Sequence, residues 1–146
     1  MTAPPARNPR LGEIAGEFAA VPDSDRLNLL LEYSDELPAL PERYAGQHEQ
    51  LELVVECQTP LFLAVEVDSD QVVHLFFDAP REAPTTRGFA AVLHAALDGL
   101  TAAEVLATPA EFVTQLGLQH LVSPLRLRGL AAMLARIKHQ VGEQAS

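Results

Sequence analysis

Three short runs of β-forming residues in the middle of the chain constrain its fold more than any other feature. They cover residues 51–55, 61–67 and 71–77 and are rich in Val, Leu and Phe, which is typical of strands. The turn Asp68-Ser69-Asp70 joins the second and third runs and predicts an antiparallel hairpin. Pro60 has no N–H to donate to a ladder, so pairing of the first and second runs is predicted to stop there. We therefore predict a small three-stranded antiparallel sheet.

Amphipathic segments on both sides of the strands predict helices. Apolar residues at helical spacing mark four longer helices, over residues 11–20, from about 24 to 37, over 85–97, and from Ser123-Pro124 to about 140. Two shorter helices are predicted to begin at Thr101, which forms a capping box with Glu104, and at Thr108-Pro109. Helices before and after three strands predict an α+β fold, with the helices packed on one face of the sheet.

The chain has the length of one domain. Its 146 residues suffice to bury a hydrophobic core without disulfides or metals. Residues 1–10 contain three prolines and no periodicity, which is typical of a terminus that is not packed on the domain. We therefore predict a flexible N-terminal tail over residues 1–10 and a single domain over residues 11–146.

Charge and cysteine content exclude several classes of protein. The 20 acidic and 10 basic side chains give a formal net charge of −10, which disfavours nucleic acids and anionic membrane surfaces as partners. No apolar run approaches the roughly 20 residues that span a bilayer, and the N-terminus lacks the apolar segment of a signal peptide. A single cysteine cannot form an internal disulfide. We therefore predict a cytoplasmic protein.

The one cysteine, Cys57, stands at the break between the first two strands, flanked by Glu56 and Gln58. A free cysteine is often a small buried hydrophobe, and this interpretation predicts a non-catalytic interaction module with an inert thiol. The position of Cys57 off the ladder, between polar neighbours, favours instead a reactive thiol on a loop positioned by the sheet. Both interpretations stay open at this point.

Other kinds of site find little support in the sequence. The five histidines show no ligand pair at short spacing, so we predict no metal site. There is no Gly-rich phosphate loop and no G-x-S-x-G motif, and we expect no bound cofactor. A Cys–His hydrolase would need an oxyanion hole and a third orienting residue, and neither is recognisable. No turnover by the isolated protein is therefore expected.

Five short motifs stand in order along the chain: Glu56-Cys57-Gln58-Thr59-Pro60-Leu61-Phe62, Arg87-Gly88-Phe89, Leu116-Gly117-Leu118, Ser123-Pro124-Leu125-Arg126 and Gly129-Leu130. Each motif is short, and together they resemble the SufE family, whose members accept sulfur from cysteine desulfurases in iron–sulfur cluster assembly. The resemblance extends from about Leu11 into the last helix, which is nearly the whole chain.

The resemblance implies a SufE/IscU-like α+β fold with the cysteine on a loop at one end of the sheet. It also implies that Cys57 accepts persulfide sulfur from a PLP-dependent cysteine desulfurase, stimulates that enzyme, and passes the sulfur to iron–sulfur scaffold proteins. Arg126 matches the family's arginine after Ser-Pro, and Arg87 its basic residue before glycine. These two arginines, with Glu56 and Gln58, are therefore candidates for partner binding or activation.

One departure from the family pattern bears on the chemistry. The family usually has glycine before the cysteine, where this chain has Glu56. A carboxylate close to a thiol raises the pKa of that thiol, so activation of Cys57 must come from Arg126 or from a group of the partner. We expect apolar residues to cover the thiol in the free protein, and the loop to swing out on docking.

Overall fold

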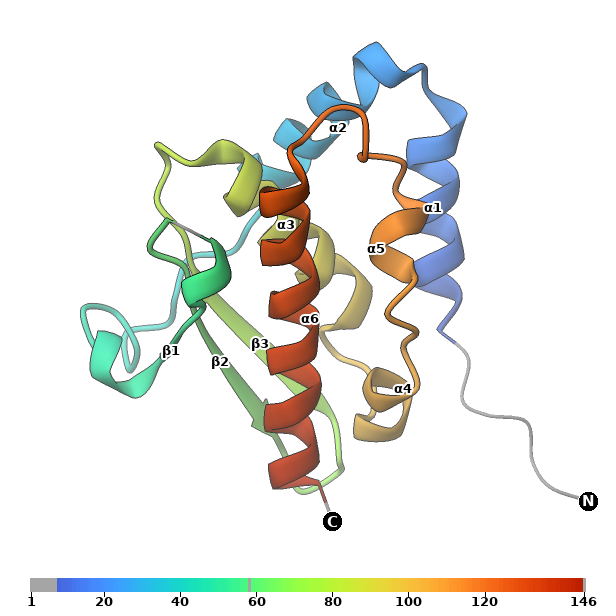
Figure 1. Ribbon diagram of the computed structural model, residues 1–146. Helices are drawn as coiled ribbons and strands as arrows, with labels where there is room; N and C mark the ends of the chain where they lie inside the picture. The colour runs from blue at the N-terminus through green and yellow to red at the C-terminus, as the bar shows by residue number, and fades with distance from the viewer. Residues whose placement is uncertain (1–7, 58, 146) are drawn as a thin grey trace, which may run out of the picture.

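The computed structural model describes residues 8–57 and 59–145, which form six α-helices and one three-stranded antiparallel sheet (Figure 1). The elements are α1 (Pro9–Ala20), α2 (Asp23–Asp35), the 3-10 turn η1 (His48–Gln50), β1 (Glu52–Leu53), the 3-10 turn η2 (Val55–Cys57), β2 (Phe62–Val67), β3 (Val73–Asp78), α3 (Pro84–Leu97), α4 (Ala102–Leu106), α5 (Phe112–Gln115) and α6 (Pro124–Gln144). The predicted α+β class and antiparallel sheet are confirmed.

The hairpin of β2 and β3 forms the centre of the sheet. Its register runs from Phe62 opposite Asp78 to Val67 opposite Val73, and the side chain of Asp68 accepts hydrogen bonds from the backbone of the turn. Residues of one sheet face are buried under the helices, as alternation in a half-covered sheet requires: Leu63, Val65, Val73, Leu75 and Phe77. The helices therefore pack on one face, as predicted.

Strand β1 is shorter than predicted, because only Glu52 and Leu53 pair with β2. The N–H of Val54 still donates to the carbonyl of Leu61 at 2.9 Å. Beyond that bond Pro60 offers no N–H, so the ladder ends and the chain turns into η2. The predicted strand over residues 51–55 is wrong at its C-terminal end, and the shortening places Cys57 in a turn.

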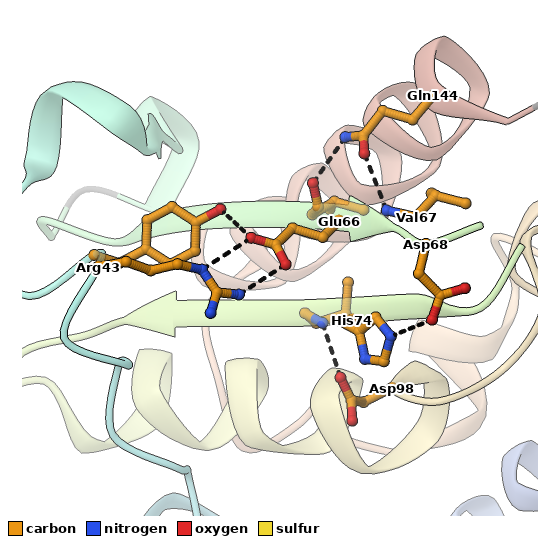
Figure 2. A network of polar contacts seen from close by, with 10 residues as sticks. Arg43, Glu66, Val67, Asp68, His74, Asp98 and Gln144 are labelled. Carbon is orange, nitrogen blue, oxygen red and sulfur yellow. Dashed lines mark hydrogen bonds and ion pairs between the residues drawn. The ribbon is translucent and has the colours of Figure 1, made fainter. Parts of the chain in front are cut away.

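Helix α6 takes over the edge of β2 that the short β1 leaves unpaired. The side-chain oxygens of Gln140 and Gln144 accept the backbone N–H groups of Val65 and Val67 at 3.1 and 3.0 Å. The amide nitrogen of Gln144 also donates to the carbonyl of Val65 at 2.7 Å, so that this glutamine makes two bonds with the strand (Figure 2). These bonds satisfy groups that an open sheet edge would expose, and they attach the C-terminal half of α6 to the sheet.

The segment between α2 and β1 covers the other face of the sheet. The ring of Tyr44 lies 5.2 Å from that of Phe76, and Arg43 forms an ion pair with Glu66 of β2 at 2.7 Å (Figure 2). The loop predicted for residues 38–50 is therefore packed on β2 and β3 through an aromatic contact and an ion pair.

Two of the predicted helix starts are confirmed by their capping bonds. Thr101 and Glu104 form the reciprocal capping box at the start of α4. The hydroxyl of Ser123 accepts the N–H of Arg126 at the start of α6. The end of α6 lies at Gln144, one turn beyond the predicted end, where its glutamines bind β2.

Two other helix starts differ from the prediction. The helix predicted to begin at Thr108-Pro109 begins instead at Phe112, because the hydroxyl of Thr108 donates back to the carbonyl of Glu104 and does not cap a new helix. Helix α1 begins at Pro9 and is capped by Asn8, which is two residues earlier than the start predicted at residue 11. The rest of the predicted tail, residues 1–7, lies outside the described residues.

Candidate functional site

Cys57 is the last residue of the 3-10 turn η2, and this turn lies against the N-terminal half of α6. Its N–H donates to the carbonyl of Val54 at 3.1 Å, which closes the turn. The thiol points into the protein: Cys57 is only 6% exposed, and its Sγ donates to the carbonyl of Gly129 at 3.7 Å. The single thiol is therefore covered in the free protein, although the turn that carries it is at the end of the sheet.

Gly129 allows α6 to approach the turn so closely. A Cβ atom at this position would lie 3.1 Å from the Cα and 3.2 Å from the Sγ of Cys57, which is closer than ordinary van der Waals contact. Glycine normally weakens a helix interior, so its presence in the middle of α6 has a packing reason. The sequence alone showed Gly129 only as part of a motif.

Arg136 connects the same helix to the turn and to the sheet. Its Nη1 pairs with the carboxylate of Glu52 in β1, and its Nη2 pairs with Oε1 of Glu56 at 2.7 Å. The Nε of Arg136 is buried and has no hydrogen-bond partner within residues 8–57 and 59–145. Sequence reasoning missed Arg136. The available signal was its spacing of seven residues from Gly129, which places both on one face of α6.

The surroundings of Cys57 keep its thiol protonated. Burial, and to a smaller extent the Glu56 carboxylate, raises the pKa of the Cys57 thiol, and Arg136 acts in the opposite direction, with a net pKa of about 12. The effect of Glu56 has the sign expected from the sequence. The pKa of Glu56 itself is lowered by a hydrogen bond from its own backbone and by Arg136. At neutral pH the turn therefore carries a charged carboxylate next to a neutral thiol.

The predicted basic residue Arg126 is exposed on the first turn of α6. It stands three residues before Gly129, on the side of the helix that faces η2. The groups that shift the pKa of Cys57 are Glu56 and Arg136, and Arg126 is not among them. Helix α6 thus presents Arg126 to solvent near the turn, while Arg136 makes the contact.

The other predicted arginine, Arg87, lies in the first turn of α3. Its Nε donates to the carbonyl of Ser34 at 3.1 Å and its Nη1 to that of Ala79 at 2.9 Å. These bonds connect the C-terminal end of α2 with the loop after β3. The fourth predicted residue, Gln58, lies outside the described residues.

An apolar surface borders the turn on the side away from α6. Val55 is 65% exposed and Leu53 is 43% exposed. They line one shallow groove together with their neighbour Val54 and with three residues on the far side of the break: Thr59, Pro60 and Phe62. Exposed apolar side chains grouped in this way are typical of surfaces that bind another protein. The covered thiol therefore lies directly beside a candidate docking surface.

Fold and site together define a small α+β domain that keeps one protonated thiol on an edge turn, beside an apolar surface. The family model of SufE, described as the Fe-S metabolism associated domain, matches residues 12–141. The chain belongs to the SufE family.

Individual relatives agree with this assignment. An uncharacterized SufE-like protein of Mycobacterium tuberculosis is 53% identical over 143 residues, covering 98% of this chain and 99% of that protein. The sulfur acceptor protein CsdE of Escherichia coli is 33% identical over 110 residues, covering 75% and 71%. The solution structure of a hypothetical protein from Thermus thermophilus superposes with a TM-score of 0.82 at 38% identity, covering 95% and 98%.

No helix within residues 8–57 and 59–145 combines the length and the apolar composition needed to cross a membrane.

Proposed function

We propose that this protein is a cytoplasmic sulfur acceptor that takes sulfane sulfur on Cys57 from a PLP-dependent cysteine desulfurase and passes it to iron–sulfur cluster assembly. Membership of the SufE family and similarity to the sulfur acceptor CsdE support the role. The observation that carries it is the placement of the single thiol, on a turn at the end of the sheet beside exposed apolar side chains.

The proposed transfer is a thiol exchange at sulfur. The Cys57 thiolate attacks the terminal sulfur of the desulfurase's cysteine persulfide, so that a new S–S bond forms on Cys57 and the S–S bond of the donor breaks. The donor cysteine leaves as a thiolate and takes up the proton that Cys57 loses. No electrons are gained or lost overall, and Cys57 then carries the persulfide to an acceptor thiol by the same reaction.

The resting geometry restricts where this reaction takes place. Only the thiolate is nucleophilic, and burial holds Cys57 in the neutral form. The turn must therefore leave α6 before the thiol can ionise and reach a donor. A covered resting thiol also protects the protein from oxidation between encounters, so the burial of Cys57 suits a carrier that is opened by its partner.

Several residues are proposed to face the desulfurase. Arg126 is exposed at the start of α6 near the turn, where its guanidinium can meet the partner when the turn opens. Glu56 and Gln58 flank Cys57 in the sequence and are proposed to contribute to partner binding. Arg87 is proposed to act at the partner surface as well, and its bonds to Ser34 and Ala79 position it there.

One observation favours a second function, a non-catalytic interaction module. A thiol that is 6% exposed and strongly protonated has the properties of an inert core residue. In this alternative the groove beside β1 binds a partner and Cys57 only packs against α6. The two functions differ in the consequence of removing the sulfur atom.

Replacing Cys57 by Ser is expected to abolish stimulation of the desulfurase while leaving its binding within about twofold, because serine keeps the volume of the turn but cannot accept sulfane sulfur. Alanine formation from free cysteine measures stimulation, and calorimetry measures binding. If the Cys57→Ser protein binds and stimulates like the original protein, the interaction module is correct and the carrier is not.

A further inference from the structure

The turn that carries Cys57 is attached to α6 by two contacts of different kinds. One is the packing of Cys57 against Gly129, which has no charge. The other is the ion pair between Glu56 and Arg136, which lies on the same face of α6 two helical turns further on. Any movement of the turn away from α6 must break the ion pair, because Glu56 and Cys57 are neighbours in η2.

The two carboxylates bound by Arg136 are held unequally. Glu52 lies in β1, where it pairs with Leu63 of β2, and its Oε1 also accepts the amide of Gln140 at 2.6 Å. Glu56 lies outside the sheet, and its side chain is 43% exposed, against 31% for Glu52. Glu56 can therefore leave Arg136 while Arg136 stays anchored to Glu52.

We propose that Arg136 is a latch for the Cys57 turn: paired with Glu56 it holds η2 against α6 with the thiol covered, and the turn opens when Glu56 is released. The proposal rests on the proposed function, since it gives a carrier thiol its route to the surface. Arg136 is then a positioning residue, which controls the availability of the thiol through Glu56 and touches no sulfur itself.

A purely electrostatic role of Arg136 predicts the opposite behaviour. The guanidinium favours the Cys57 thiolate, so its removal from a turn that stays closed would make the thiol less reactive. If Arg136 is a latch, its removal increases the fraction of molecules with an open turn, and the thiol becomes more reactive. The sign of the change in Cys57 reactivity therefore separates the two roles.

The test is the rate of alkylation of Cys57 by iodoacetamide in the Arg136→Met protein, at about pH 9 and without a desulfurase. At this pH an exposed thiol is largely ionised, so the rate reports the fraction of open molecules. The latch predicts a rate about five- to tenfold faster than in the original protein. This factor corresponds to the usual contribution of a partly exposed ion pair to stability. An unchanged or slower rate would overturn the proposal.

Matched variants distinguish the loss of the latch from a general loosening of the protein structure. Arg43 makes a similar two-point contact with Glu66 on the other face of the sheet, at 2.7 and 3.2 Å. The Arg43→Met protein is therefore expected to alkylate at the original rate, and an equal acceleration there would refute a specific latch. Arg136→Lys keeps the charge but reaches fewer acceptors, and it is expected to restore much of the original rate.

If Arg136→Met fails to fold, the Glu56→Gln protein tests the same contact from the other side. It breaks the pair with Arg136 and leaves Glu52 in place. The latch predicts faster hydrogen exchange of the Cys57 amide, which is bonded to Val54 in the closed turn. Unchanged exchange would contradict the latch, since a change in thiol pKa alone does not open that bond.

These outcomes are independent of sulfur transfer. Alkylation and hydrogen exchange are measured on the isolated protein, so a latch can be present in a chain that accepts no sulfur, which would refute the proposed function alone. Persulfide transfer at the original rate in Arg136→Met, together with unchanged alkylation, would refute the latch alone.

Discussion

Alkylation of Cys57 in the folded protein is expected to be about a thousandfold slower near pH 8 than in the unfolded chain, where a thiol has a pKa of about 8.5. Burial raises the pKa of Cys57 to about 12 when the turn is closed, and the thiolate fraction falls about tenfold for each pH unit between the pH and the pKa. If the turn opens before the thiol ionises, the free energy of opening also makes the reaction slower than in the unfolded chain.

The closed turn is expected to lose stability, and the alkylation of Cys57 to become faster, as the pH rises. The pKa of the thiol is higher in the folded than in the unfolded chain, so the closed turn has its full stability below about pH 8.5 and loses it as the pH rises toward 12. The alkylation rate of the folded protein should therefore keep rising about tenfold per pH unit above about pH 9, where the rate in urea levels off. If the alkylation rate of the folded protein levels off at the same pH as the rate in urea, the thiol is not covered.

Replacing Gly88 by Ala is expected to destabilise the protein by about 2 kcal/mol, with a loss of roughly 5 °C in Tm. Gly88 of α3 packs directly on α2, and an added Cβ would lie 2.7 Å from both the Cγ and the carbonyl oxygen of Leu30. The backbone oxygen cannot move without shifting α2. This overpacking outweighs the gain of about 1 kcal/mol that alanine brings to a helix. Urea unfolding measures the difference.

Gly16 supplies the control for this substitution. It lies in α1 at an exposed position, and no atom lies within 4 Å of an added Cβ. Gly16→Ala should therefore stabilise the protein by about 0.5–1 kcal/mol. Equal effects of the two substitutions would show that the contact between α2 and α3 is looser than the structure indicates.

Local signals in the sequence were enough for most of the fold. The turn at Asp68 and the alternating residues around it predicted the hairpin of β2 and β3, and the capping residues Thr101 and Ser123 predicted the starts of α4 and α6. The wrong start of α5 has its cause in the preceding helix, which takes the hydrogen bond of Thr108. Thr108 donates to Glu104 of α4, so the same residue type that caps a helix elsewhere does not start α5.

The site was predictable only in part. The position of Cys57 at a strand break followed from Pro60 and from the neighbouring residue types. Its burial and its link to Arg136 depend on where α6 crosses the turn, and Arg136 is 80 residues from Glu56 and 84 from Glu52 in the chain. An arginine in a helix is usually a solvated charge, and the spacing of Arg136 from Gly129 indicated a shared helix face but not these two partners.

The mass of the intact protein after incubation with an active cysteine desulfurase and free cysteine tests the proposed function most directly. A sulfur acceptor gains one sulfur atom on Cys57, which a reductant removes and which the Cys57→Ser protein does not show. An unchanged mass, while the desulfurase forms alanine and binds the protein, would contradict sulfur acceptance by Cys57.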